Sequence, residues 1–232
     1  GADTLKSGLG ADTFEGGQGD DLVTYASSPG NVVIGPATDG SGTPILAASS
    51  AQLLSHAPGD VLYEIERITG SRLDDTILGW ETTSNNLDGF DGDDSLTGGD
   101  AVDMLIGSAG ADTMDAGAHP EDRTTYVFSP AAVQVDLVTN DNRGGDAEGD
   151  ALFGIEFIQA SRFSDAITAD DAANELSGLE GSDTLIGGGG DDTIFGGTGD
   201  DVIAGDDGAD LIVAAAGDDF LDGGLGDDEI RA

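Results

Sequence analysis

Apolar residues recur every nine positions along most of this chain. In the segment 178–231, six units of nine residues follow one another without a gap, and each has an aliphatic residue at its eighth position. The residues at positions 7 and 9 are mixed. An apolar side chain between two variable neighbours is typical of a short strand with one buried face. The pattern therefore predicts a stack of short β-strands with the eighth position turned inward.

The remaining positions of each unit predict turns with an acidic edge. Glycine always stands at position 4 and aspartate at position 6, so the unit reads GGxGxDxUx, in which U is apolar. Glycines at positions 1, 2 and 4 are expected to adopt positive φ and to let the backbone approach an ion closely. Calcium takes about six to eight oxygen ligands and accepts backbone carbonyls beside carboxylates. A glycine-rich hexapeptide that ends in aspartate supplies both kinds of oxygen.

The spacing divides the chain into three blocks of repeats. We expect blocks at 1–24, 61–124 and 151–232, with one inserted residue near Trp80 in the middle block. Two interruptions, at 25–60 and 125–150, separate them. The segments 59–79 and 149–169 are identical at 10 of 21 positions. A composite unit of repeats and interruption is therefore duplicated.

Each interruption contains one predicted element of its own. In the first, the sequence SSAQLLSH, at 49–56, predicts a short helix behind a serine N-cap. In the second, Val133, Val135 and Leu137 alternate with polar residues and predict a strand with an apolar face.

Charge limits the partners of this chain. There are 47 acidic residues against 7 basic ones, with a net charge of −40, and self-repulsion of this size opposes compaction. We therefore expect calcium ions as partners. Nucleic acid is excluded because its phosphates need clustered Lys and Arg. The absence of a long apolar run argues against insertion into a membrane, and the absence of cysteine excludes disulfides and thiolate metal sites.

We expect no catalytic site in this sequence. Paired acids recur in the repeats, whereas an active site is needed only once, so the pairs indicate metal ligands. His56 and His119 have no metal-ligand spacing and are expected on loop surfaces. A second set of residues stands at outward positions and is apolar: Ile186, Val202, Phe220, Phe195, Leu211 and Val213. They predict either scattered exposed side chains or a surface for self-association or for a neighbouring domain.

The GGxGxDxUx units resemble the hemolysin-type calcium-binding repeats of bacterial RTX proteins over about three quarters of the chain. The resemblance implies an all-β fold, a right-handed parallel β-roll with two units per turn and calcium held between successive turns at each edge. The implied carboxylate ligands are Asp3, Asp12, Asp21, Asp75, Asp94, Asp103, Asp112, Asp165, Asp183, Asp192, Asp201, Asp210, Asp219 and Asp228. The implied backbone carbonyl ligands are those of Gly181, Gly187, Gly190, Gly196, Gly199, Gly205, Gly208 and Gly217.

With two units per turn, aspartates two units apart are expected to stack along one edge. Several units depart from the motif at position 6: Glu66, Asn85, Glu156 and Asn174. In addition, Ala214 and Ala215 replace a glycine pair. We expect poor or no occupancy at the N-terminal end of the edge that contains Glu156 and Asn174. The second interruption also holds four acids, which predict either an additional site or a solvated loop: Asp141, Asp146, Glu148 and Asp150.

The sequence begins within a repeat, so we expect a piece of a longer protein. The resemblance implies type I secretion and folding on extracellular calcium. We therefore predict a non-catalytic calcium-binding segment, secreted or on the bacterial cell surface, that serves as a structural or adhesive stalk or as part of a surface layer. The alternative is the C-terminal accessory or secretion domain of a toxin or of an exoenzyme such as a protease, lipase or epimerase.

Overall fold

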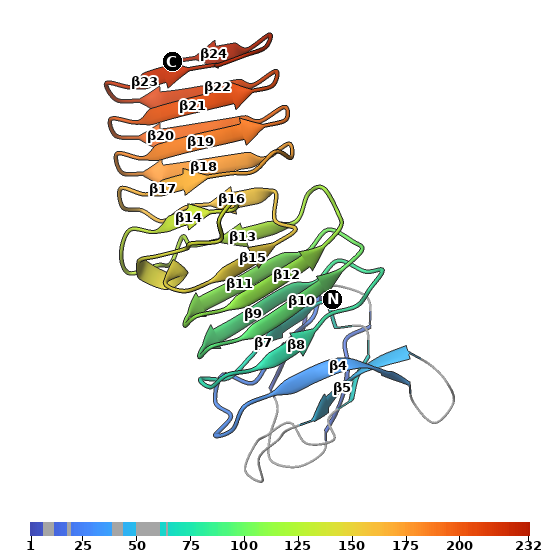
Figure 1. Cartoon of the computed structure of the whole chain (residues 1–232). Helices are drawn as coiled ribbons and strands as arrows, with labels where there is room; N and C mark the ends of the chain where they lie inside the picture. Colours follow the sequence, from blue (N-terminus) through green and yellow to red (C-terminus); the bar gives the residue numbers. More distant parts are fainter. Residues whose placement is uncertain (7–11, 18–19, 39–43, 50–60, 64) are drawn as a thin grey trace. The chain divides into compact units, whose positions relative to one another are not determined.

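A computed structural model describes residues 1–6, 12–17, 20–38, 44–49, 61–63 and 65–232. The chain forms two compact units, Gly1–His119 and Pro120–Ala232. Each unit is a coil of short strands that pair mainly in parallel, and the fold is an all-β parallel solenoid, as predicted (Figure 1). Among the described residues, no helix is long and apolar enough to cross a membrane.

The first unit contains two sheets. In order of pairing, one contains β1 (Thr4–Lys6), β3 (Leu22–Thr24), β7 (Arg67–Thr69), β9 (Asn86–Asp91) and β11 (Met104–Ala109). The other contains β2 (Thr13–Glu15), β6 (Val61–Tyr63), β5 (Pro44–Ser49), β4 (Val33–Thr38), β8 (Thr76–Leu78), β10 (Ser95–Gly99) and β12 (Thr113–Gly117).

The predicted insertion near Trp80 is visible in the spacing between turns. Asp94 and Asp112 stand one turn and 18 residues apart. Asp75 and Asp94 also stand one turn apart, but 19 residues separate them. The extra residue lies in the turn between β8 and β9, where it lengthens the edge and leaves the strands in register.

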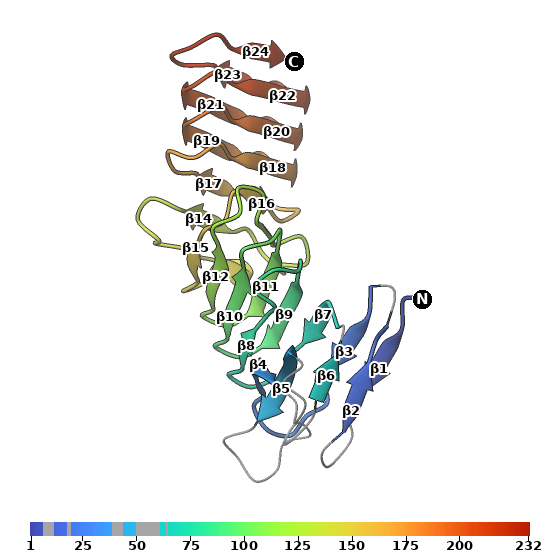
Figure 2. The same cartoon turned by 90° about the vertical axis from the view of Figure 1, so that its right-hand side faces the viewer.

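The first interruption adds strands to the solenoid. β4 pairs antiparallel with β5, and the two strands form a hairpin. β4 also pairs parallel with β8, so it occupies the place of a repeat strand in the sheet. Figure 2 shows β4 and β5 beside β8. The predicted helix at 49–56 falls almost entirely outside the described residues. Its first residue, Ser49, ends β5.

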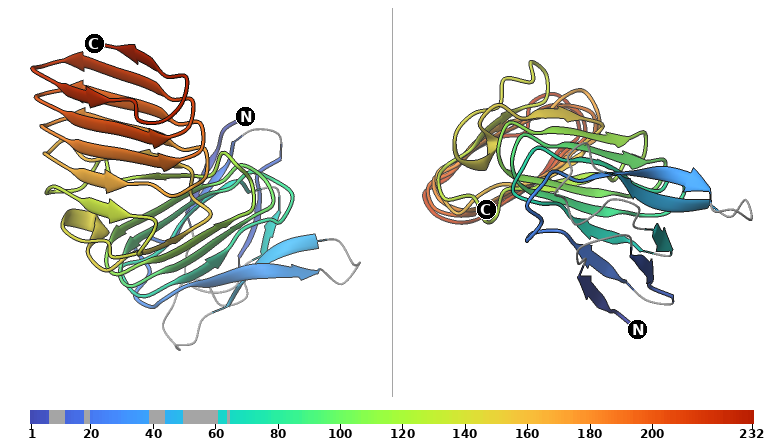
Figure 3. Two further views of the ribbon diagram at one scale, coloured as in Figure 1. Left: turned by 45° about the horizontal axis from the view of Figure 1, so that its top comes forward. Right: turned by 90° about the horizontal axis from the view of Figure 1, so that it is seen from below.

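The second unit repeats the same architecture with more regular turns. In order of pairing, one sheet contains β13 (Arg123–Thr125), β16 (Phe157–Gln159), β18 (Glu175–Glu180), β20 (Thr193–Thr198), β22 (Leu211–Ala216) and β24 (Glu229–Arg231). The other contains β14 (Gln134–Asp136), β17 (Ala166–Thr168), β19 (Thr184–Gly189), β21 (Val202–Asp207) and β23 (Phe220–Asp222). Successive turns of this unit superpose as one flattened coil in the view from below (Figure 3).

The second interruption also joins the solenoid through a strand. β14 pairs parallel with β17, and it buries Val133 and Val135 while Leu137 is half-buried. This confirms the predicted strand with an apolar face. A 3-10 helix (Gly145–Ala147) and β15 (Ala151–Phe153) complete the interruption.

The core consists of the inward residues at position 8. Each side chain packs between the equivalent residues of the turns before and after it, and burying such a side chain contributes about 1.5–3 kcal/mol. The fully buried set contains Val23, Ile68, Ile77, Leu87, Leu96, Leu105, Met114, Ile158, Ile167, Leu176, Leu185, Ile194, Ile203 and Ile212. In the outermost strands, Leu5, Phe14 and Leu221 are half-buried and Ile230 is exposed.

Candidate metal sites

The position-6 aspartates of the second unit form two ladders, one along each edge of the coil. In each ladder the backbone N–H of one aspartate donates to Oδ1 of the aspartate one turn later. Asp165, Asp183, Asp201 and Asp219 are linked in this way by bonds of 2.8, 2.9 and 2.9 Å. Asn174, Asp192, Asp210 and Asp228 form the other ladder, with bonds of 2.7, 2.9 and 3.1 Å. The predicted stacking is therefore confirmed.

The first unit carries the same ladders. Asp75, Asp94 and Asp112 are joined by bonds of 2.7 and 2.8 Å. Asn85 donates to Oδ1 of Asp103 at 2.6 Å. The ladder continues across the first interruption at Asp21. Oδ1 of Asp21 accepts from the N–H of the exposed Asp3 at 2.7 Å, and the N–H of Asp21 donates to Oε2 of Glu66, beyond the interruption, at 3.1 Å. Asp12 is half-buried and directly precedes β2.

The second carboxylate oxygen of several of these aspartates is buried inside the turn. Oδ2 is buried without a hydrogen-bond donor in Asp21, Asp94, Asp183, Asp192, Asp201 and Asp210. Leaving a buried charged oxygen without a partner costs more than the roughly 1–3 kcal/mol of a neutral group. A regular series of such oxygens is what a protein presents to a cation.

Backbone carbonyls face the same spaces. A Cβ on Gly178 would overlap Oδ2 of Asp183 and lie 2.6 Å from the carbonyl oxygen of Gly196. The next unit repeats this arrangement, because a Cβ on Gly187 would overlap Oδ2 of Asp192 and lie 2.8 Å from the carbonyl oxygen of Gly205. At each edge, a carboxylate and the position-1 carbonyl of the following turn therefore border one small space. At Gly178 and Gly187 this space has no room for a Cβ, whereas the loop of Asp219 has the buried Ala214 at position 1.

The three glycine positions serve different purposes, which corrects the prediction of positive φ at all of them. Positive φ occurs at positions 2 and 4, for example at Gly197 (112°) and Gly199 (129°), whereas Gly196 at position 1 does not have it. At position 4 a Cβ on Gly199 would overlap the carbonyl oxygen of Gly181, and one on Gly208 would overlap that of Gly190. Gly217 meets the carbonyl of Gly199 in the same way. The position-4 backbones thus stack directly on one another.

Burial raises the pKa values of several carboxyl groups in the ladders. Burial, followed by the charges of neighbouring carboxylates, raises the pKa of Asp94 to about 8. The same two causes raise the pKa of Asp183 and of Asp192 to about 7. Desolvation disfavours the charged form, and like charges add to the effect. A bound divalent cation would lower these pKa values, because its positive charge favours the charged form of the carboxylate.

These residues fit calcium. The spaces at Gly178 and Gly187 are bordered by carboxylate and carbonyl oxygens, and calcium prefers oxygen ligands and accepts both types. Among the described residues, no three His, Cys, Asp or Glu side chains converge. A bound ion would therefore take a single carboxylate from each neighbouring turn and its remaining oxygens from the backbone. When bound, calcium would supply the positive charge that the ladders lack.

Two predicted ligands have partners within the protein. Oδ1 and Oδ2 of Asp165 accept hydrogen bonds from Ser161, and Asp75 accepts from Ser71 in the equivalent turn. Asp75 and Asp165 thus differ from Asp94, Asp183, Asp192, Asp201 and Asp210, whose Oδ2 has no donor.

Asp122 belongs to the edge, although a strict nine-residue spacing passes over it. It is fully buried, and its N–H donates to Oε2 of Glu156 at 3.3 Å. Asp122 stands at position 6 because the following residue, Arg123, pairs with Phe157. Counting nine residues from Asp112 leads to Glu121 instead. The buried Thr124, at position 8 of this unit, is polar and gave no apolar signal.

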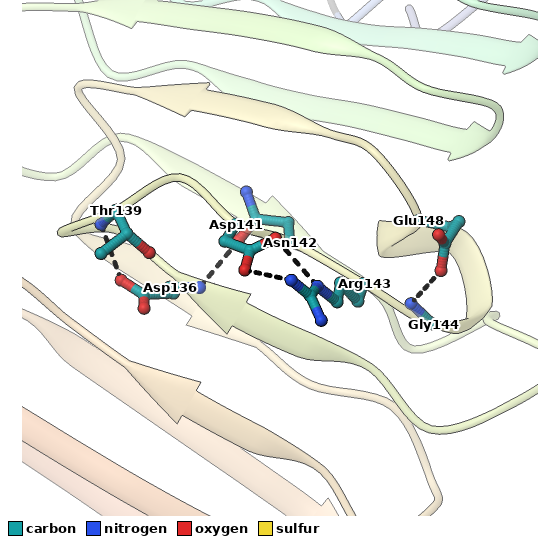
Figure 4. A network of polar contacts seen from close by, with 7 residues as sticks. All are labelled: Asp136, Thr139, Asp141, Asn142, Arg143, Gly144 and Glu148. Carbon is teal, nitrogen blue, oxygen red and sulfur yellow. Dashed lines mark hydrogen bonds and ion pairs between the residues drawn. The ribbon is translucent and has the colours of Figure 1, made fainter.

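The side chains of three of the four acids in the second interruption have partners within the protein, which favours the loop interpretation. Arg143 forms an ion pair with Asp141 that is exposed to solvent, and Glu148 accepts from the N–H of Gly144 at 2.9 Å (Figure 4). Asp150 is buried and accepts from the hydroxyl of Tyr126 at 2.9 Å. Asp146 donates its N–H to Ser129.

His119 takes no part in the ladders described above. His119 is half-buried at the end of the first unit, and His56 lies outside the described residues.

The fold and the edge chemistry together define a class, the calcium-binding parallel β-solenoid. The profile of the RTX calcium-binding nonapeptide repeat matches residues 1–26, 88–118, 151–185, 168–203 and 195–230, more than half of the chain. The chain therefore belongs to the RTX calcium-binding nonapeptide repeat family. A comparison with curated proteins gives no match. In this family the repeat region itself is non-catalytic and binds calcium, and the proteins that carry it are typically exported by type I secretion.

Proposed function

We propose that this chain is a structural segment of a secreted or surface-bound bacterial protein, which folds when it meets extracellular calcium and then acts as a stalk or as part of a surface layer. The observation that carries the proposal is the series of buried carboxylate oxygens without donors, represented by Asp183, Asp192 and Asp201. They make the folded state costly unless a cation is present.

The energetics support folding that depends on calcium. Neighbouring turns lie about 4.8 Å apart, the usual spacing of paired strands. Two unit charges at this distance repel by roughly 3–4 kcal/mol at an effective dielectric constant near 20. The penalty recurs wherever one aspartate follows another in a ladder. Calcium converts the repulsion into attraction, so its binding free energy becomes folding free energy.

The duplication of the composite unit supports a stalk or surface-layer role. Each copy carries an interruption whose strand joins the solenoid, through β4 in one unit and β14 in the other. Repetition of one mechanical element lengthens a support, whereas a secretion or accessory domain needs only one copy. The alternative role, an accessory domain of an exoenzyme or toxin, rests on the same calcium chemistry.

Outward apolar side chains support contact with another domain or copy. Phe195, Val202 and Phe220 are 36%, 46% and 65% exposed, while Ile186, Leu211 and Val213 are half-buried. Changing Phe195 and Leu211 to Ser is expected to weaken assembly in sedimentation experiments if these residues form a contact. Unchanged assembly would mean that they are scattered surface residues.

Circular dichroism of the chain in EGTA and then in millimolar calcium tests the proposed mechanism. We expect little β-structure in EGTA at neutral pH and a cooperative gain of β-signal with calcium. A β-rich spectrum that EGTA leaves unchanged would contradict it.

The stalk role needs a separate experiment on the parent protein. Deleting residues 1–232 in frame is expected to abolish display or attachment at the cell surface, detected by labelling an epitope outside the segment. Loss of a secreted enzymatic activity with attachment intact would instead support the accessory role.

A further inference from the structure

The turn that follows each interruption differs from the later turns of its unit. It contains two edge loops, 70–75 and 79–85 in the first unit and 160–165 and 169–174 in the second. We refer to each pair of loops as a starter turn. The starter turns correspond to each other in the duplicated composite unit, and they carry Asp then Asn at position 6 in both copies.

In the first loop of each starter turn, the protein satisfies both oxygens of the position-6 aspartate. Oδ2 of Asp165 accepts from the N–H of Ser161 at 2.8 Å, and Oδ1 accepts from the Ser161 hydroxyl at 2.7 Å. Oδ1 also accepts from the N–H of Val133 in the interruption at 2.7 Å. Asp75 repeats this pattern with the N–H and hydroxyl of Ser71 and the N–H of Val32.

The second loop replaces the carboxylate by an amide. The amide nitrogen of Asn85 donates to the carbonyl oxygens of Trp80 and Thr83 at 3.0 and 2.9 Å. In the other copy, the amide nitrogen of Asn174 donates to the carbonyl oxygen of Ala172 at 2.8 Å and to Oδ1 of Asp170 at 3.1 Å. An amide carries no charge, and its two N–H groups occupy oxygens that would otherwise face a cation.

The backbone at position 2 separates the two kinds of loop. Where Oδ2 lacks a donor, the residue at position 2 has positive φ, as at Phe90 (83°) before Asp94 and Leu179 (74°) before Asp183. The same holds for the loops of Asp21, Asp192, Asp201 and Asp210, whose position-2 residues are Gly17, Gly188, Gly197 and Asp206.

In the starter turns, none of the position-2 residues Ser71, Trp80, Ser161 and Asp170 has positive φ. The N–H groups of Ser71, Trp80 and Ser161 donate to the position-6 side chain, whereas Oδ1 of Asn174, in the loop of Asp170, is buried without a donor. An N–H directed at a carboxylate oxygen occupies the side from which a cation would bind. The loop conformation therefore decides whether the acid meets a donor or is left for a metal ion.

We propose that the starter-turn loops of Asp75, Asn85 and Asp165 hold no calcium, and that hydrogen bonds from Ser71, Trp80 and Ser161 take its place. Each copy of the composite unit then has, between its interruption and its calcium-binding run, a turn whose first loop is complete without metal. This turn offers an ordered edge on which the next turn stacks when calcium arrives. The inference rests on the proposed function, because it presupposes that the other turns bind calcium.

Counting calcium on single-residue variants of the full chain tests this inference, by native mass spectrometry or by equilibrium dialysis with calcium alone. Asp165→Asn is expected to leave the number of bound ions unchanged. Asp201→Asn is the matched control, because Asp201 belongs to the same ladder but its Oδ2 has no donor. This variant is expected to lose at least one ion. Equal losses in the two variants would overturn the inference while leaving calcium-dependent folding intact. A wild-type chain that binds no calcium would instead overturn the proposed function.

A second variant covers the case in which Asp165→Asn fails to fold. Ser161→Ala removes the hydroxyl donor but keeps the carboxylate. Ser164→Ala in the same loop is its control, because Ser164 is exposed and its hydroxyl makes a surface contact to the N–H of Ser182 and none to Asp165. In saturating calcium, Ser161→Ala is expected to lower Tm by several degrees, since a loss of about 1 kcal/mol shifts Tm by about 2–4 °C in a chain of this size. Its calcium count is expected to equal that of wild type. A lower count would show that Ser161 helps to bind calcium and would overturn the inference.

Discussion

The backbone N–H of Asp183 donates to Oδ1 of Asp201, one turn later, at 2.9 Å, while Oδ2 of Asp201 stays buried without a donor. One oxygen of the carboxylate thus holds two turns together, and the other is left for a cation. The same division recurs along both edges of the second unit. A single aspartate side chain therefore both links neighbouring turns and leaves a buried charged oxygen available to a cation.

Acid is expected to replace part of the calcium requirement. The pKa values of Asp94, Asp183 and Asp192 are raised to about 8, 7 and 7 from an ordinary value of 3.8. A group whose pKa is higher in the folded state takes up a proton on folding. Its contribution to stability is complete below the unfolded pKa and is lost as pH rises through the folded pKa. The metal-free fold should therefore be more stable near pH 5 than near pH 8.

Circular dichroism in EGTA across this range measures the effect. We expect more β-signal at the acidic end, with a midpoint of calcium-induced folding that moves to higher calcium as protons compete for the same oxygens. The spectrum in excess calcium at neutral pH provides the reference for the folded state. An EGTA spectrum independent of pH would contradict the prediction.

Removing one ladder charge is expected to weaken calcium-induced folding. Asp192→Asn keeps the Oδ1 acceptor for the N–H of Asn174 but removes the charge on a buried carboxylate whose Oδ2 has no donor. The calcium midpoint should rise roughly tenfold, equivalent to about 1.4 kcal/mol. Asp191→Asn is the control, because the exposed Asp191 makes only a surface contact to the N–H of Ala209. Equal midpoints for the two variants would mean that Asp192 is not a ligand.

The inward face of the strands should carry the packing energy. Ile194 is fully buried in β20, and Ile194→Ala is expected to cost about 2–5 kcal/mol through lost burial and the cavity that remains. Val202→Ala removes a side chain that is 46% exposed on the outer face of β21, and it should cost less than about 1 kcal/mol. Urea denaturation in saturating calcium compares the two variants. A similar loss of stability in both would place the core elsewhere.

Stacking at position 4 is expected to tolerate no side chain. Gly199 has φ of 129°, and a Cβ there would overlap the carbonyl oxygen of Gly181. Gly199→Ala should therefore cost about 1–3 kcal/mol or more, because the strained backbone and the overlap add. In Gly189→Ala the new Cβ would lie 3.3 Å from its nearest neighbour, Cα of Asp171, and φ is not positive. Thermal melts in calcium should show a large loss for the first variant only.

Much of the architecture could be predicted from spacing alone. A unit of nine residues with one apolar position places Leu185 and Ile194 inward on different sheets, and both are fully buried. Asp122 escaped this reasoning because one extra residue shifts it from the strict spacing and because Thr124 gives no apolar signal. The parallel pairing of β13 with β16 shows that Asp122 stands at the same position of the repeat as Glu156.

The sequence by itself determined the repeat, the inward residues and the stacking of acids along two edges, because periodicity alone specifies which residues share a face. It could not distinguish Asp165 from Asp183, which are the same residue at the same position of the repeat. Only the tertiary structure shows that Ser161 satisfies one of them while Oδ2 of the other has no donor. The physical reason is the direction of a single peptide group: Leu179 adopts positive φ and Ser161 does not, and residue type did not predict either conformation.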